Sequence, residues 1–274
     1  MIIVGIMPPP PITSLQNQRV KDAAKLRERR QRDKQGRILI DGARELLRAI
    51  EAGLELTEVF VCPSLCQTDD SRRVLDLLDR TRAEILHVTP EVFGKLAFGE
   101  RAEGVLGVAR TPGARLADLD PPADALLAVV ESVEKPGNLG AVLRSADAAG
   151  VSAVIAAGRG VDLYSPNVIR ASLGVIFTLP VAAATAEETK AWLASRNVRI
   201  YAARVDARQL YTETSYAGGA AIVLGSEAAG LSSVWSGAAV TPIKLPMHGA
   251  ADSLNISAAA AVIFYEALRQ RAAR

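Results

Sequence analysis

Three segments of the chain combine glycines with polar side chains in a way that could hold a ligand. They are EKPGNLGAVLR (134–144), GSEAAGLS (225–232) and LPMHGAADSLNIS (245–257), here called the first, second and third motif segments. Each follows an apolar run, and in open α/β sheets ligands bind beyond the carboxyl ends of the strands. Phosphate binding, nucleophilic catalysis and cofactor recognition are therefore the chemistries to test against them.

Two common chemistries do not fit these segments. A dinucleotide-binding turn needs G-x-G-x-x-G, but Leu139 stands where the middle glycine should follow Gly137. The phosphate-loop pattern G-x-x-x-x-G-K-[ST] is absent. A nucleophile elbow needs G-x-S-x-G, whereas Ser226 lies in Gly-Ser-Glu and the chain offers only two histidines as a general base. Hydride transfer and acyl transfer are therefore both disfavoured.

The elements that must position these segments follow an α/β pattern. In the first half we expect strands at 38–40, 56–62, 84–88 and 104–110. They alternate with helices expected at 15–35, 43–53, 72–82 and 90–98. In the second half we expect strands at 125–131, 152–158, 177–181, 198–204, 220–225 and 240–247. The helices there are expected at 141–150, 165–174, 186–197 and 254–273. Such alternation predicts the α/β class with much parallel pairing.

Prolines divide the chain into parts. Pro8 to Pro11 favour extended geometry near the start, and TPGARLADLDPPAD (111–124) interrupts the pattern with three prolines. We therefore expect a flexible leader at 1–14, a smaller N-terminal α/β domain at 15–111, a linker at 112–124 and a second domain at 125–274.

Charge is distributed unevenly along the 274 residues, although the formal net charge is only +2. Residues 19–37 hold nine basic side chains against three acidic ones, so the remainder is net negative. This excludes a uniformly basic nucleic-acid coat but not a local basic arm. The helix expected at 15–35, with Ser14 as its N-cap, is polar on almost every side, so we expect it to be exposed or docked on a partner.

Cysteine and histidine usage argues against a zinc site or a disulfide framework. Cys62 and Cys66 form a single C-x-x-x-C pair, and the two histidines lie elsewhere. The apolar start MIIVGIM is too short to span a membrane and lacks a signal peptide's charged start. We therefore predict a cytoplasmic protein without metal and without a membrane partner.

The three motif segments, taken in order, resemble those of a known family. The first carries N-x-G-x-x-x-R at Asn138, Gly140 and Arg144. The second carries L-G-S-E from residue 224 with Gly-Leu at 230–231, and the third carries L-P-M at 245–247 followed by S-L-N-I-S at 253–257. On these residues the chain resembles the SpoU (TrmH-like) family of RNA ribose 2′-O-methyltransferases, within the SPOUT superfamily.

The resemblance extends upstream of these motifs. Residues 38–61 and 104–110 look like the family's N-terminal substrate-binding domain, and residues 12–37 resemble the lead-in helix of rRNA-modifying members. The resemblance implies a SPOUT-type catalytic domain with a deep trefoil knot, preceded by an RNA-binding domain. It also implies S-adenosylmethionine as cofactor and no metal. By position, the residues lining the cofactor pocket would be Ala203, Leu224, Gly225, Leu245, Met247 and Leu254.

The resemblance also implies catalytic roles for Arg144, Asn138, Glu227, Ser253 and Asn255. Arg144 would help deprotonate the ribose hydroxyl. Since arginine stays protonated in proteins, it could instead stabilise the developing alkoxide or hold the adjacent phosphate. Asn138 and Glu227 would orient that guanidinium, and Ser253 and Asn255 would position the substrate. Asn255 also suits the N-cap of the last helix.

Basic side chains near the N-terminus are the candidates for contact with the RNA backbone, which clustered Lys and Arg bind. The predicted RNA-binding residues are Arg19, Lys21, Lys25, Arg27, Arg29, Arg30, Arg32, Lys34, Arg37 and Arg44. Aromatic residues make up only 4% of the chain, which argues against a broad base-stacking platform. Recognition of a folded RNA by shape and backbone fits better.

We predict ribosomal RNA, of the 23S type, as the substrate, and a homodimer as the family implies. Resistance to a ribosome-targeting antibiotic is one role found in the family. A tRNA ribose 2′-O-methyltransferase is an alternative, although tRNA-type members often lack an N-terminal domain. A non-catalytic RNA-binding protein that retains the knot is another, although Asn138, Arg144, Glu227 and Asn255 are all intact.

Overall fold

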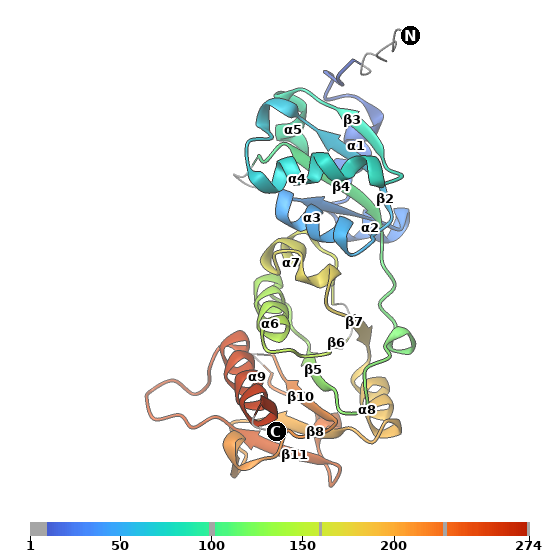
Figure 1. The fold of residues 1–274 in the computed structure, drawn as a ribbon. Helices are drawn as coiled ribbons and strands as arrows, with labels where there is room; N and C mark the ends of the chain where they lie inside the picture. Colours follow the sequence, from blue (N-terminus) through green and yellow to red (C-terminus); the bar gives the residue numbers. More distant parts are fainter. Residues whose placement is uncertain (1–9, 99–101, 159–160, 227–228, 273–274) are drawn as a thin grey trace. The chain divides into compact units, whose positions relative to one another are not determined.

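The structure is a computed structural model that describes residues 10–98, 102–158, 161–226 and 229–272. The chain forms two compact units. One comprises residues 1–112 with 164–166, and the other comprises residues 113–163 with 167–274. Each is a sheet with helices packed on it (Figure 1).

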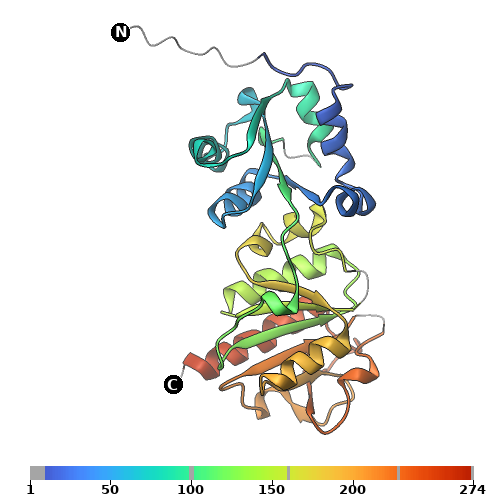
Figure 2. The same ribbon diagram turned by 90° about the vertical axis from the view of Figure 1, so that its right-hand side faces the viewer.

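The first unit is built on a four-stranded sheet of order β1-β4-β2-β3, in which β4 is antiparallel to both neighbours and β2 is parallel to β3. The strands are β1 (Arg37–Asp41), β2 (Leu56–Val61), β3 (Glu84–His87) and β4 (Val105–Arg110). The helices are α1 (Gln18–Lys25), α2 (Arg29–Gln35), α3 (Ala43–Glu51), α4 (Asp69–Leu77) and α5 (Pro90–Leu96). Helices α1 and α5 lie on one face, and α3 and α4 on the other (Figures 1 and 2). All four predicted strands of this half are confirmed.

The helix predicted at 15–35 is wrong in its extent and in its exposure. It is two helices, α1 and α2, and the N-cap of α1 is Asn17 rather than Ser14: the Asn17 side chain accepts a hydrogen bond from the backbone N of Arg19 at 2.9 Å. Its few apolar side chains fall on one face and are buried against α5 and the sheet. They are Val20, Ala23 and Leu26. This segment is therefore part of the core and not an exposed arm.

The segments predicted as leader and linker are packed where the structure describes them. Ile12 forms a parallel bridge with Val88, and its backbone N donates to the His87 carbonyl at 2.8 Å. In the predicted linker, Leu119 is buried in the core of the second unit, and Leu116 packs against the same core. Both segments contribute apolar contacts, which their proline content concealed.

The second unit is built on a seven-stranded parallel sheet of order β7-β6-β5-β10-β8-β11-β9. The strands are β5 (Leu126–Glu131), β6 (Ala153–Ala157), β7 (Val181–Ala184), β8 (Arg199–Ala203), β9 (Gln209–Leu210), β10 (Ala220–Leu224) and β11 (Val240–Lys244). The helices are α6 (Pro136–Ala148), α7 (Pro166–Ala171), α8 (Ala186–Ser195) and α9 (Ile256–Ala272). Helices α6 and α9 cover one face and α8 the other (Figures 1 and 2). The predicted α/β class with a parallel sheet is confirmed.

The central strands explain why the sequence pattern was readable. Every residue of β5, β6 and β10 is buried. Strands covered on both faces read as continuous apolar runs, and AVIAA and AAIVL have this form. Leu127 and Val129 of β5 join the core cluster on the α8 side, together with Leu193 of that helix.

Two predicted elements of the second unit are wrong. The strand expected at 177–181 is instead the end of a 3₁₀ turn (Val175–Phe177) followed by β7, which begins after Pro180 because proline has no N–H for the ladder. The helix expected from residue 141 begins at Pro136, so most of the first motif segment is helical and not loop. Strand β9 was not predicted.

Candidate active site

The carboxyl ends of three parallel strands meet at a cavity of ≈ 500 Å³. Ala203 lies at the end of β8, Leu224 and Gly225 at the end of β10, and Leu245 directly after β11. Residues of the third motif segment and the first turn of α9 complete the wall. Small-molecule sites are typically about 300–1,000 Å³ and lie at this edge of a parallel sheet, so the cavity has the size and place of a ligand site.

All six residues predicted to bind the cofactor line this one cavity. They are Ala203, Leu224, Gly225, Leu245, Met247 and Leu254. Ser253, predicted to be catalytic, lines it as well. Leu224 is buried, whereas Leu254 is 41% exposed and sits as a large apolar side chain open to a ligand. The end of β8 and the second and third motif segments are separate in the sequence, and they line the same cavity.

Sequence reasoning missed a charged pair in the same wall. Arg204 and Asp206 follow β8 directly and line the cavity. Arg204 donates twice to the Asp206 carboxylate, with Nε to Oδ1 and Nη2 to Oδ2 both at 2.9 Å. This hydrogen bonding holds the pKa of Asp206 below its usual range. The sequence feature that could have revealed this pair is two opposite charges, two residues apart, immediately after a predicted strand.

Gly225 is required by the chain's own backbone. A Cβ at this position would lie 2.3 Å from the carbonyl carbon and 2.4 Å from the oxygen of Gly230, and 2.7 Å from the N of Leu231. A hydrogen bond closes this loop, because the Gly230 N–H donates to the Ser226 carbonyl at 3.0 Å. The close backbone approach at Gly225 is therefore to its own loop, and a side chain here would deform the cavity wall.

The first and third motif segments are joined by side chains. Asn255 Nδ2 donates to Asn138 Oδ1 at 3.2 Å, across 117 residues of sequence. Asn255 Oδ1 also accepts from the N and Oγ of Ser257, at 2.9 and 2.6 Å. Asn255 therefore caps α9, as one reading predicted, while its amide ties that cap to α6.

Arg144 lies apart from the cavity lining. It is an exposed side chain of α6, and in the described part of the chain it has no hydrogen bond or ion pair. Gly140, one turn earlier, allows α6 to touch the end of α7, because a Cβ there would lie 2.4 Å from Ala171 Cβ. Glu227, predicted to orient the arginine, lies outside the described residues.

A buried carboxylate that sequence reasoning missed supports the second motif segment. Glu131 ends β5 and is 5% exposed. Its two oxygens accept from the N and Oγ of Ser232, both at 2.7 Å. A glutamate ending an otherwise apolar buried strand was the available signal.

Comparison with known proteins identifies this arrangement. Residues 125–265 match the SpoU rRNA Methylase family. The chain belongs to the SpoU rRNA methylase family. Residues 17–107 match the MRM3-like substrate binding domain, which is the first unit described above without its terminal segments.

Relatives of this SpoU protein cover nearly its whole length. The 23S rRNA (uridine(2479)-2′-O)-methyltransferase of Streptomyces viridochromogenes is 31% identical over 90% of this chain and 88% of its own. A solved RNA 2′-O ribose methyltransferase is 44% identical, with a TM-score of 0.83 over 95% of this chain and 99% of that one. An AdoMet-bound rRNA methyltransferase from Sinorhizobium meliloti is 27% identical, with a TM-score of 0.85 over 95% and 97%.

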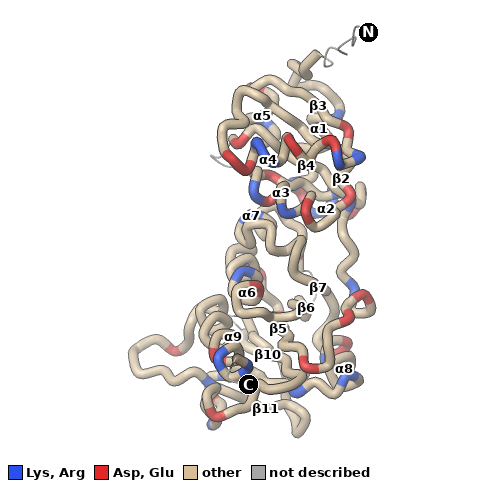
Figure 3. Tube along the Cα trace, in the orientation of Figure 1, with Lys and Arg blue, Asp and Glu red and all other residues tan. Residues whose placement is uncertain are grey.

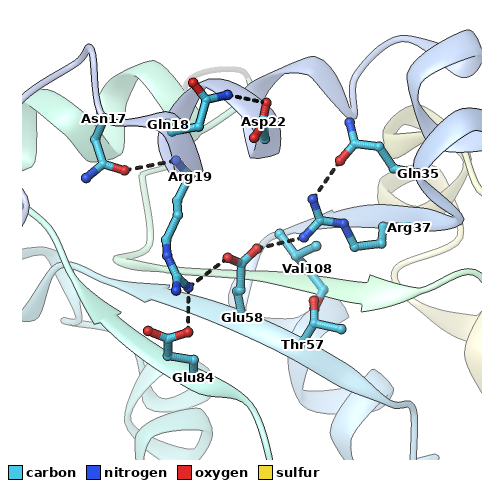
Figure 4. Close-up of polar contacts among 10 residues, drawn as sticks. All are labelled: Asn17, Gln18, Arg19, Asp22, Gln35, Arg37, Thr57, Glu58, Glu84 and Val108. Carbon is cyan, nitrogen blue, oxygen red and sulfur yellow. Dashed lines mark hydrogen bonds and ion pairs between the residues drawn. The ribbon is translucent and has the colours of Figure 1, made fainter.

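Several basic side chains of the substrate-binding domain are used to hold it together. Arg19 Nη1 donates to Glu58 at 3.1 Å and to Glu84 at 2.5 Å, and Arg37 Nη1 donates to the second oxygen of Glu58 at 3.0 Å (Figure 4). The Glu84 hydrogen bond is the main cause of a raised pKa at Arg19. These contacts tie α1 and β1 to β2 and β3.

Other predicted RNA contacts are also engaged within the domain. Arg27 Nη2 donates to the carbonyls of residues 95–97, and Arg32 is buried, with Nη1 donating to the carbonyls of Leu26 and Arg27 at 2.8 Å each. Three further cations form exposed ion pairs: Lys25 with Asp22, Arg29 with Asp33, and Arg44 with Asp70. Lys and Arg accordingly alternate with Asp and Glu along this domain (Figure 3).

Three of the ten predicted RNA contacts remain available. Lys21, Arg30 and Lys34 are exposed, and their side chains have no hydrogen bond or ion pair within the described part of the chain. Arg30 and Lys34 are four residues apart on α2 and therefore share one face.

Among the residues that the structure describes, no group of three His, Cys, Asp or Glu side chains is placed to hold a metal ion. No helix in the described ranges is long and apolar enough to cross a membrane.

Proposed function

We propose that this protein transfers the methyl group of S-adenosylmethionine to a ribose 2′-hydroxyl of 23S ribosomal RNA. The observation that carries the proposal is the cavity at the ends of β8, β10 and β11, which all six predicted cofactor contacts line. The names of relatives support the substrate and the cofactor: one is a 23S rRNA 2′-O-methyltransferase, and one is an rRNA methyltransferase with AdoMet bound.

The residues of the cavity fit S-adenosylmethionine. Leu245, Met247 and Leu254 offer apolar surface for an adenine ring, and the Asp206 carboxylate offers an acceptor for hydroxyl or ammonium groups. When bound, this cofactor supplies a methyl group already activated by the positive sulfur. What the protein must add is alignment of the acceptor and compensation of the charge that develops on its oxygen.

Arg144 is the residue we propose for that compensation. Its guanidinium is exposed and is not already paired within the described residues. It can therefore face the developing alkoxide or the neighbouring phosphate without first breaking another contact. Asn138 and Asn255 hold α6 against the third motif segment, so they position the helix that carries the arginine. Ser253 and Glu227 stay predicted contacts to the substrate and to Arg144.

We propose the trefoil knot and the homodimer that the family implies. The dimer is supported by a stripe on α9: Ala258, Val262 and Tyr265 recur at helical spacing, and the last two are 40% and 51% exposed. Because Arg144 does not line the cavity of its own chain, we propose that it approaches the cavity of the second subunit.

Subunit mixing tests this arrangement. Arg144→Ala lacks the arginine, and Gly225→Val lacks an intact cavity. If the arginine acts across the interface, each mixed dimer regains one working site, and random mixing restores about a quarter of the wild-type activity. If it acts within its own chain, no mixture recovers activity.

We propose that the substrate-binding domain grips the RNA backbone through Lys21, Arg30 and Lys34. Removing one cation that binds a phosphate should reduce the slope of log K against log salt by about 0.7–0.9. Changing all three to Gln should therefore lower the slope by about two to three. The matched control changes Lys25, Arg29 and Arg44, which are paired within the domain, to Gln and should leave most of the slope.

A labelled-methyl assay tests the function itself. Unmodified 23S rRNA should accept methyl groups, and mapping of the modified residue should show a ribose 2′-O-methyl. Incorporation into tRNA alone would establish the tRNA alternative, and incorporation into neither, with RNA still bound, would establish a non-catalytic protein. We propose a cytoplasmic location, because the proposed substrate is ribosomal RNA. Antibiotic resistance stays a prediction that depends on the nucleotide mapped.

A further inference from the structure

A second cavity adjoins the one assigned to the methyl donor. It has a volume of ≈ 520 Å³ and shares Arg204 and Asp206 with the first. Those two side chains form a doubly hydrogen-bonded pair, so the shared wall is rigid and its charges largely cancel. The second cavity therefore needs another group if it is to hold a charged ligand.

Arg208 supplies that group. It lines the second cavity, is exposed, and has no hydrogen bond or ion pair within the described part of the chain. Three apolar residues, Trp235, Val240 and Pro242, line the same cavity; the first two are nearly fully buried and Pro242 is exposed. An exposed apolar residue in the same cavity as an unpaired guanidinium matches a nucleotide, which has a flat base and an anionic phosphate.

The segment around Trp235 is held in place before any ligand arrives. Ser232, three residues before Trp235, is fixed by the Glu131 carboxylate through two hydrogen bonds of 2.7 Å. Lys190 of α8 also donates to the carbonyls of Val234 and Ser236, the two neighbours of Trp235 in the sequence, the latter at 2.9 Å. Because these hydrogen bonds already hold the segment around Trp235, a base can bind there with little loss of conformational freedom.

A third cavity of the second unit is a poorer match to RNA. It measures ≈ 200 Å³, and the charged side chains that line it, Glu134 and Asp162, are both carboxylates. Like charge disfavours a phosphate there. A ribose that reaches the methyl donor is flanked by phosphates on both sides, so an adjacent nucleotide must lie close to the donor cavity.

We propose that the second cavity binds a nucleotide adjacent to the one that is methylated, with its phosphate on Arg208 and its base against the exposed Pro242, in the cavity that the buried Trp235 also lines. This inference rests on the proposed function and names the path of the substrate strand. Arg208 is thus a substrate-positioning residue rather than part of the donor site.

The two tryptophans allow a direct test on the full-length protein. Trp192 lies on α8 beneath Arg196 and does not line the cavity, whereas Trp235 does. With ¹⁵N-labelled tryptophan there are two indole signals, assigned with Trp192→Phe. The protein is first saturated with S-adenosylhomocysteine, and the dinucleoside monophosphates UpU, ApA, GpG and CpC are then titrated in. We expect a saturable shift of the Trp235 signal with the Trp192 signal unchanged.

The arginine is tested by a charge-matched pair of variants. Arg208→Gln should weaken the dinucleotide titration and raise the KM for 23S rRNA by roughly five- to tenfold, with affinity for S-adenosylhomocysteine unchanged. Arg115→Gln removes the same charge at a site where the arginine is already paired with Asp118, and should change neither value.

Two results would overturn the subsite. One is a Trp235 signal moved by S-adenosylhomocysteine alone and by no dinucleotide, which would assign the cavity to the donor. The other is an unchanged KM for rRNA in Arg208→Gln. Failure of the wild-type protein to methylate rRNA would instead contradict the proposed function. The dinucleotide titration distinguishes failure of the subsite from failure of the function, because it measures binding and requires no turnover.

Discussion

Gly140 offers the sharpest prediction about how the first motif segment is built. In Gly140→Ala, the new methyl would lie 2.4 Å from Ala171 Cβ, 2.6 Å from the Ala171 carbonyl carbon and 2.7 Å from Ser172 N. Two of these three atoms belong to the backbone, so the contact can be relieved only by moving α6 or the end of α7. Overpacking of this kind costs about 1–3 kcal/mol.

The expected net effect follows from two opposing terms. A contact this short belongs at the upper end of the range, about 3 kcal/mol. Alanine in a helix interior recovers about 1 kcal/mol relative to glycine. The remaining 2 kcal/mol or so should lower Tm by about 4–8 °C for a unit of this size. Turnover should fall as well, because the same helix carries Asn138, whose 3.2 Å bond to Asn255 depends on its position.

Gly137→Ala is the matched control. Gly137 lies on the same helix, one turn earlier, with no atom within 4 Å of a built Cβ. This variant should keep or gain up to about 1 kcal/mol of stability. Thermal unfolding followed by circular dichroism compares the two variants directly. Equal Tm shifts in both would refute the argument that close helix contact, and not helix propensity, requires the glycine of the first motif segment.

Three further predictions concern other parts of the second unit. Arg144→Ala should abolish methyl transfer and leave the calorimetric affinity for S-adenosylhomocysteine within about twofold, since the side chain does not line the cavity; an equal loss of affinity would contradict its role. Gly225→Val should abolish that affinity, because its side chain meets the backbone of Gly230; normal binding would contradict the geometry. Burial raises the pKa of Tyr216, so the unfolded chain releases this proton first and stability should fall as pH rises above about 10. Tyr216→Phe should flatten that alkaline loss in urea titrations, and an unchanged slope would count against it.

The sequence predicted those parts of the second unit that produce a recognisable local pattern of residues. Strands buried on both faces, such as β5 and β10, appear as apolar runs, and glycine-rich segments at their ends marked the edge where ligands bind. The six predicted cofactor contacts were placed by family resemblance, and the cavity that they line could not have been predicted from periodicity. Pairing of β8 with both β10 and β11 creates that cavity, and pairing order is a property of the whole sheet.

The first unit shows where local reading failed. A polar segment with few apolar residues predicted an exposed arm, yet Val20 and Leu26 fall on one face and are buried. Charge counting likewise treated Arg19 and Arg37 as available for RNA, although Glu58, distant in sequence, takes both. Composition records how many charges a segment carries, and only the fold shows which of them are already paired.

Paired and unpaired cations look alike in the sequence but have different roles in the structure. An arginine whose donors are taken by carboxylates, such as Arg19, stabilises its domain and has little charge left for phosphate. An exposed arginine that is unpaired within the described residues, such as Arg144, Arg30 or Arg208, can still attract an anionic ligand. Arg144 lies on α6, Arg30 on α2 and Arg208 in the loop after β8, and each is a proposed contact to the RNA. Backbone contacts spread along a strand fix its register, and register decides which ribose reaches the methyl group. We therefore expect the RNA specificity of this protein to depend on which cations the fold leaves unpaired, and not on how many the chain contains.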